Sequence, residues 1–80
     1  MSDDLMQRVI EVIAATQKIP VETVTADSTF EDLKIDSLDG INILFAIENE
    51  FNISVPDDAA RELRSVRGVA EGVDKLLTSA

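Results

Sequence analysis

A chain of 80 residues has room for one small domain, and 16 acidic against 7 basic residues give it a formal charge of −9. It contains no cysteine and no histidine, which excludes disulfides and argues against a zinc or iron–sulfur site. No Ser-His or Cys-His catalytic pair can be built either, and we assign no metal ligands. The negative charge disfavours nucleic acid and anionic lipid and favours basic partners.

No apolar run in the sequence is long enough to cross a bilayer. The chain begins with the acidic residues Asp3 and Asp4, where a secretory signal would be basic. We therefore expect a monomer that acts in the cytoplasm and does not insert stably into a membrane.

Helical periodicity dominates the sequence, and no segment alternates apolar and polar residues over the length of a strand. Pro20 ends the first periodic segment, Pro56 suits the first turn of a later helix, and Ser65 can cap the last one. The long connection before the second helix contains enough apolar residues to be ordered by its own side chains. The sequence predicts an all-α fold, a small four-helix bundle with three main helices, one short helix and a long ordered loop. Within a single domain 1–80, helices are expected over about 3–15, 37–51, 57–63 and 66–77, and the loop over 16–36.

The predicted second helix carries apolar residues on two nearly opposite faces, at about 100° per residue. One stripe comprises Ile43, Leu44, Ile47 and Phe51, and the other comprises Leu38, Ile41 and Phe45. The first stripe can face the core of a bundle, which leaves the second exposed beside Glu48. An exposed apolar patch of this kind marks a contact site, unless the long loop covers it.

Ser37 lies between Asp36 and Asp39, where the long loop meets this second helix. Taken alone, the serine predicts a helix cap, because its hydroxyl can accept a backbone N–H. A phosphorylation site is another interpretation, since a helix N-terminus favours a phosphate group. If Ser37 is only a cap, the protein is an acidic helical adaptor that binds partners and carries nothing.

The segment Asp36-Ser37-Leu38-Asp39, followed by an apolar helix that ends Ile47-Glu48-Asn49-Glu50-Phe51, resembles the acyl carrier protein family. The resemblance covers nearly the whole chain, including residues 29–33 before the serine and 51–56 after the second helix. It implies that Ser37 is joined through a phosphodiester to 4′-phosphopantetheine from coenzyme A, whose thiol carries acyl groups as thioesters. The implied function is that of a carrier and not an enzyme, and the implied pathway is fatty acid or related lipid biosynthesis. A carrier of aminoacyl or polyketide intermediates is the alternative within the same class.

The resemblance also implies the partners, a phosphopantetheinyl transferase and acyl-transferring and chain-modifying enzymes with basic docking surfaces. Acidic side chains and the exposed stripe would contact them, while the bundle interior would hold the acyl chain. The residues implied at the partner surface are Asp36, Leu38, Asp39, Ile41, Phe45 and Glu48. The residues implied at the acyl pocket are Ile43, Ile47 and Val66.

Several positions depart from the pattern common in fatty-acid carriers. Ile35 stands where a glycine is frequent, and Gly40 lies in the first turns of the second helix. Asn42 and Asn49 replace acidic residues. Three arginines, spaced by three residues, predict either a solvated face or an altered choice of partner: Arg61, Arg64 and Arg67. These departures favour a specialised carrier.

Overall fold

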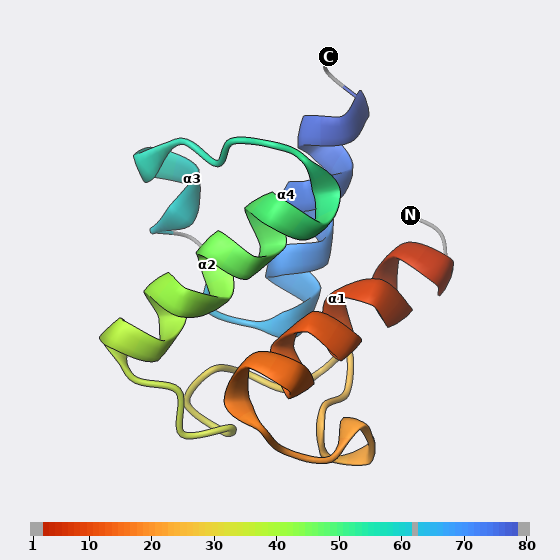
Figure 1. The fold of residues 1–80 in the computed structure, drawn as a ribbon, viewed down its shortest axis with the longest axis vertical. Coiled ribbons are helices and arrows are strands. Elements are labelled where there is room, and N and C mark those ends of the chain that lie inside the picture. The colour runs from red at the N-terminus through yellow and green to blue at the C-terminus, as the bar shows by residue number, and fades with distance from the viewer. Residues whose placement is uncertain (1–2, 62, 79–80) are drawn as a thin grey trace.

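The computed structural model describes residues 3–61 and 63–78, and the regular elements of these residues are helices. Its helices are α1 (Asp3–Gln17), α2 (Ser37–Phe51), α3 (Asp57–Ala60) and α4 (Val66–Thr78), with a 3-10 turn η1 at Val21–Thr23. Over these residues the only β-type pairing is one isolated antiparallel bridge between Thr29 and Ser65. The all-α, four-helix prediction is confirmed. Figure 1 shows the connection between α1 and α2 wrapping the end of the bundle where α1 ends and α2 begins.

The helix bounds differ from the sequence prediction at three ends. Helix α1 extends to Gln17, and α4 extends to Thr78. The third helix is much shorter than the predicted 57–63, because it ends at Ala60. Beyond it, Leu63 lies outside any helix and packs against the core of the bundle.

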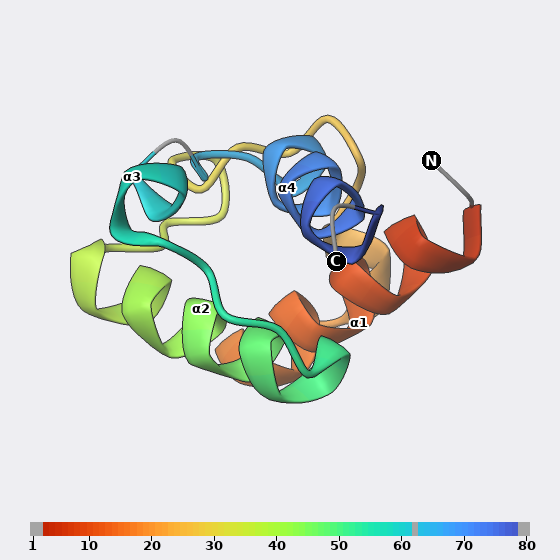
Figure 2. The same ribbon diagram turned by 90° about the horizontal axis from the view of Figure 1, so that it is seen from above.

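The core is built from one face of each long helix. Figure 2 shows these three helices, α1, α2 and α4, around the middle of the molecule. The stripe of α2 predicted to face inward does so, since Ile43, Ile47 and Phe51 are buried. The same core takes Leu5, Val9, Ile10, Ile13 and Ala14 from α1, Val66, Val69, Ala70 and Val73 from α4, and Val24 and Ile35 from the loop. No polar side chain is buried anywhere in 3–61 or 63–78. Apolar packing therefore holds the helices together, as helical amphipathicity requires.

The long loop is ordered by a short helical turn just before α2. Thr29 and Asp32 close the start of this turn, each side chain accepting the other residue's backbone N–H at 3.0 and 3.2 Å. Lys34, at φ 58°, closes its end, and the Ile35 N–H donates to the Phe30 carbonyl at 2.8 Å. This turn directs Ile35 into the core two residues before Ser37.

Two backbone hydrogen bonds then tie the loop to the segment that leads into α4. The Phe30 N–H donates to the Arg64 carbonyl at 2.9 Å, and the Val66 N–H donates to the Ser28 carbonyl at 3.0 Å. Ser65 caps α4, as predicted, by accepting the Gly68 N–H at 3.0 Å. The loop thus holds the start of α2 in place, and the loop is itself hydrogen-bonded to the segment that leads into α4.

Candidate functional site

The N-terminus of α2 is capped by Asp36 and not by Ser37. Asp36 has the extended backbone of a cap, and its Oδ1 accepts the Asp39 N–H at 2.8 Å. Its carbonyl accepts the Gly40 N–H at 2.9 Å, which begins the helical ladder. The interpretation of Ser37 as a cap is therefore wrong, because Ser37 is already the first helical residue.

The Ser37 side chain is exposed and takes no part in any hydrogen bond within residues 3–61 and 63–78. The first backbone N–H groups of a helix lack carbonyl partners inside it, and here Asp36 satisfies only the one on Asp39. The N–H groups of Ser37 and Leu38 therefore remain available to an anion, at the positive end of the helix dipole. The start of α2 thus combines an accessible hydroxyl with unpaired N–H donors. This combination suits a phosphate ester on the oxygen of Ser37.

A pocket of about 560 Å³ opens beside Ser37, between α2, α3, α4 and the loop. Its apolar wall comprises Phe30, Ile35, Ile41, Ile43, Leu44, Ile47, Ala60, Leu63 and Val69. Its polar lining residues are Asp36, Ser37, Asp57 and Arg61. A space with this lining suits an aliphatic group that enters from the serine.

Two of the three residues predicted for this pocket line it, Ile43 and Ile47. Val66 does not line it, and is instead part of the core at the start of α4. Sequence analysis did not assign Phe30, Ile35 and Leu63 to the pocket. They lie outside the regular helices, where periodicity carries no information about the face that a side chain takes.

The second stripe of α2 is exposed, as predicted, and the long loop does not cover it. Leu38, Ile41 and Phe45 keep 67%, 48% and 58% of their surface accessible. Asp36 is exposed next to this stripe, and Asp39 is half-buried. The two acids therefore lie close to Ser37 at the start of α2, where the exposed apolar stripe begins with Leu38.

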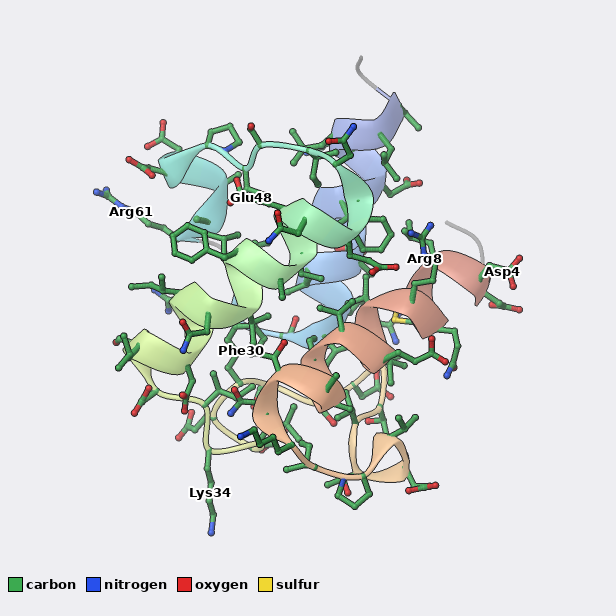
Figure 3. The ribbon with its side chains drawn as sticks, viewed as in Figure 1. Asp4, Arg8, Phe30, Lys34, Glu48 and Arg61 are labelled. Atoms are coloured by element: carbon green, nitrogen blue, oxygen red, sulfur yellow. The ribbon has the colours of Figure 1, made fainter. Side chains whose placement is uncertain are left out.

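Glu48 is engaged in the fold and is half-buried. Its Oε2 accepts the backbone N–H of Val55 at 2.8 Å, across the turn that follows α2. In Figure 3 the labelled side chain lies on α2 beside the connection to α3. This carboxylate is consequently less available to a partner than its position on the helix implied.

The three regularly spaced arginines do not form one helical face, because α3 ends before the first of them. Arg61 lines the pocket, and its side chain extends outward from the bundle (Figure 3). Arg67 on α4 pairs with Asp27 of the loop at 2.8 Å, an exposed ion pair worth at most about 1 kcal/mol. All three arginines are nevertheless exposed, as the solvated interpretation expects, although they do not share one helical face.

Residues 3–61 and 63–78 contain neither a cluster of metal ligands nor a membrane-spanning helix. No group of three or more acidic, cysteine or histidine side chains is arranged to hold a metal ion within that range. Among the helices of the same range, none combines the length and the apolar character needed to span a membrane.

Comparison with known proteins decides the family. A family model described as a phosphopantetheine attachment site matches residues 7–73. The acyl carrier protein of Rickettsia canadensis is 41% identical over 71 residues, which cover 88% of this chain and 83% of that protein. This chain belongs to the acyl carrier protein family.

Other members agree with this assignment in sequence and in fold. The acyl carrier protein of Rickettsia bellii is 43% identical over 68 residues, covering 84% of this chain and 79% of that one. The crystal structure of the acyl carrier protein from Thermotoga maritima superposes with a TM-score of 0.82 at 28% identity, covering 95% of this chain and 89% of that one.

Acyl carrier proteins are carriers and not enzymes, and the cofactor of this carrier is a covalently attached 4′-phosphopantetheine. The start of α2 fits that group. It combines an exposed hydroxyl, unpaired N–H donors for a phosphate and an apolar pocket alongside. The bound cofactor supplies the thiol that this chain, which has no cysteine, does not contain.

Proposed function

We propose that Ser37 is the attachment residue and that the protein carries acyl intermediates of fatty acid or related lipid biosynthesis as thioesters. The observation that carries the proposal is the position of the Ser37 hydroxyl. It is exposed at the start of α2, and it lies at an apolar pocket large enough for an acyl chain. The names of the relatives support the acyl cargo, and their family model supports the attachment chemistry.

Attachment is a phosphoryl transfer from coenzyme A to the serine. The Ser37 oxygen attacks the phosphorus nearest the pantetheine, the bond from that phosphorus to the bridging oxygen breaks, and adenosine 3′,5′-bisphosphate leaves. The hydroxyl proton passes to a general base in the complex with the transferase. The N–H groups of Ser37 and Leu38 would donate hydrogen bonds to the new phosphodiester.

The partners in this proposal are a phosphopantetheinyl transferase and enzymes that transfer or modify acyl groups through basic docking surfaces. Leu38, Ile41 and Phe45 form the apolar centre of the contact, and Asp36 and Asp39 attract the basic rim. Of the six residues assigned to this surface, Glu48 has the least support, because its carboxylate already accepts the Val55 N–H. A charge of −9 opposes self-association and supports a soluble monomer, which we place in the cytoplasm.

Intact-mass measurement after incubation with coenzyme A and a broad-specificity phosphopantetheinyl transferase tests the attachment. The native chain should gain the mass of one phosphopantetheine, and the Ser37→Ala variant should gain none. Ser54→Ala, at another exposed serine, is the matched control and should be modified fully. The Ser37→Ala chain should keep its helical circular dichroism, because Asp36 supplies the cap.

An unmodified native chain, or a modified Ser37→Ala chain, would refute the proposal. In the first case, partner binding that survives Ser37→Ala would indicate the adaptor in place of the carrier. The pathway is tested separately, by isolating the protein from its own cells and identifying the acid on the thiol. A linear fatty acyl group is the expected result, and an aminoacyl or polyketide group would replace that assignment.

A further inference from the structure

Arg61 places a positive charge beside the acidic start of α2. It directly follows α3 and lines the pocket beside Ser37, where it is the only basic residue among the described ones. Asp36 and Asp57 are the acids that line the same pocket. The surface around Ser37 therefore carries charges of both signs, although the chain as a whole is at −9.

The Arg61 guanidinium has no carboxylate partner within the part of the chain that the structure describes. Asp57 lies four residues earlier, at a spacing that allows an ion pair on a helix, yet no such pair forms. The arginines that do form ion pairs among the described residues are Arg8 and Arg67. Arg61 is thus an exposed cation that is available to an anion from outside the chain.

Arg61 is continuous with the exposed apolar stripe of α2. Ile41 belongs to that stripe, and it also lines the pocket that Arg61 lines. Figure 2 shows α3 beside the first half of α2, the half that begins with Asp36 and Asp39. The stripe therefore has acids at the start of α2 and a cation on the side of α3.

We propose that Arg61 selects, among the enzymes that act on this carrier, those whose docking surface presents a carboxylate beside its basic residues. The basic residues meet Asp36 and Asp39, an apolar patch covers the stripe of α2, and an aspartate or glutamate meets the Arg61 guanidinium. Because such an enzyme acts on the group carried at Ser37, this proposal rests on the proposed function.

The chemistry of arginine suits this selection. A guanidinium can donate two parallel hydrogen bonds to one carboxylate, which fixes how the two proteins are oriented as well as holding them together. A docking surface that is basic throughout would instead place a positive charge against Arg61 and would be repelled. One side chain therefore favours a surface of mixed charge and disfavours a uniformly basic one.

The phosphodiester on Ser37 is the other anion that could meet Arg61, and the structure favours the protein carboxylate. Unpaired N–H groups at the start of α2 are already available to the phosphate. In Figure 3 the Arg61 side chain extends outward from the bundle, toward the surface that a partner would contact.

The test measures how tightly the carrier, loaded at Ser37 and verified by intact mass, binds the enzymes that act on it. The phosphopantetheinyl transferase and each acyl-transferring or chain-modifying enzyme of the same cells are purified, and their Kd values are measured by biolayer interferometry. At least one enzyme should bind Arg61→Glu about tenfold more weakly than the native chain. Arg61→Ala should weaken the same complex by about threefold, because it removes the attraction without adding repulsion.

Arg64→Glu is the matched control. It makes the same change of charge at an exposed arginine three residues later, which does not line the pocket. Added negative charge by itself attracts a basic docking surface, so Arg64→Glu should leave the Kd unchanged or slightly lower. The sign of the change therefore separates a carboxylate opposite Arg61 from the general attraction between an acidic carrier and a basic enzyme.

A cross-link identifies the carboxylate itself. Arg61→Lys keeps the positive charge and supplies an amine that a carbodiimide can join to a carboxylate in contact with it. The coupled peptide, read by mass spectrometry, names the aspartate or glutamate of the enzyme. Replacing that residue with lysine should restore the affinity for Arg61→Glu to within about threefold of the native pair.

A Kd for Arg61→Glu that equals or falls below that of the native chain with every enzyme would overturn the proposal. So would a loss that is seen with the loaded carrier and disappears in a Ser37→Ala background, because Arg61 would then act on the phosphodiester. Failure of the proposed function is a separate result, since it appears as the absence of phosphopantetheine on Ser37 by intact mass. Successful loading with no loss of affinity refutes only the role of Arg61.

Discussion

Substitution of Glu48 distinguishes a structural role for this carboxylate from a docking role. Its Oε2 accepts the Val55 N–H at 2.8 Å, and the side chain is half-buried. Glu48→Ala removes the acceptor and leaves the N–H to partial solvation. Glu48→Gln removes the charge but keeps an oxygen that can accept the same hydrogen bond.

The expected loss follows from the bond that is broken. A hydrogen bond to a charged group contributes about 1.5–3 kcal/mol, and water recovers part of this at a half-buried site. We therefore expect Glu48→Ala to lower the free energy of unfolding by about 1–2 kcal/mol. In a domain of this size that corresponds to a fall in Tm of roughly 5–15 °C. Glu48→Gln should lose about 0.5 kcal/mol, because an amide oxygen is the weaker acceptor.

Urea denaturation followed by far-ultraviolet circular dichroism measures both variants against the native chain. Each removes one negative charge from a chain at −9, so relief of repulsion is common to the two and cancels in their difference. Alanine also favours a helix more than glutamine does, which works against the predicted order. Equal stabilities for the two variants would refute the hydrogen-bond argument. A native-like Glu48→Ala chain with weakened partner binding would return Glu48 to the docking surface.

Three further predictions concern stability alone. Lys34 has φ 58°, a backbone conformation that costs a residue with a side chain about 1 kcal/mol. Lys34→Gly should therefore raise the free energy of unfolding by roughly 0.5–1 kcal/mol, and a lower urea midpoint would contradict this. Gly40 lies inside α2, and a Cβ added there would meet nothing within 4 Å. Gly40→Ala should therefore raise the free energy of unfolding by about 1 kcal/mol in the same assay, and a lower value would show an unrecognised contact. Sodium chloride should raise the Tm of the native chain by screening its excess acids, and a flat Tm across a salt series would rule out that repulsion.

Much of the site follows from the sequence because it is a matter of helical geometry. The 3.6-residue repeat fixes the angle of every side chain on α2, so the buried stripe with Ile47 and the exposed stripe with Phe45 are local properties of the chain. The break in periodicity before residue 37 likewise predicts where α2 begins, and with it the position of Ser37. The start of a helix needs no distant residue to supply its unpaired N–H groups.

The tertiary structure decided two kinds of feature: contacts between residues far apart in the sequence, and the exact residue at which a helix begins or ends. Both Asp36 and Ser37 are good caps, and only the backbone conformation assigns that role to Asp36. The engagement of Glu48 depends on how the chain turns after α2, seven residues along to Val55. Leu63 lines the pocket beside Ser37 because it leaves α3 behind and packs close to Gly72 of α4. Contacts between irregular segments leave no periodic pattern in the sequence. Their positions are therefore set only when the helices pack together.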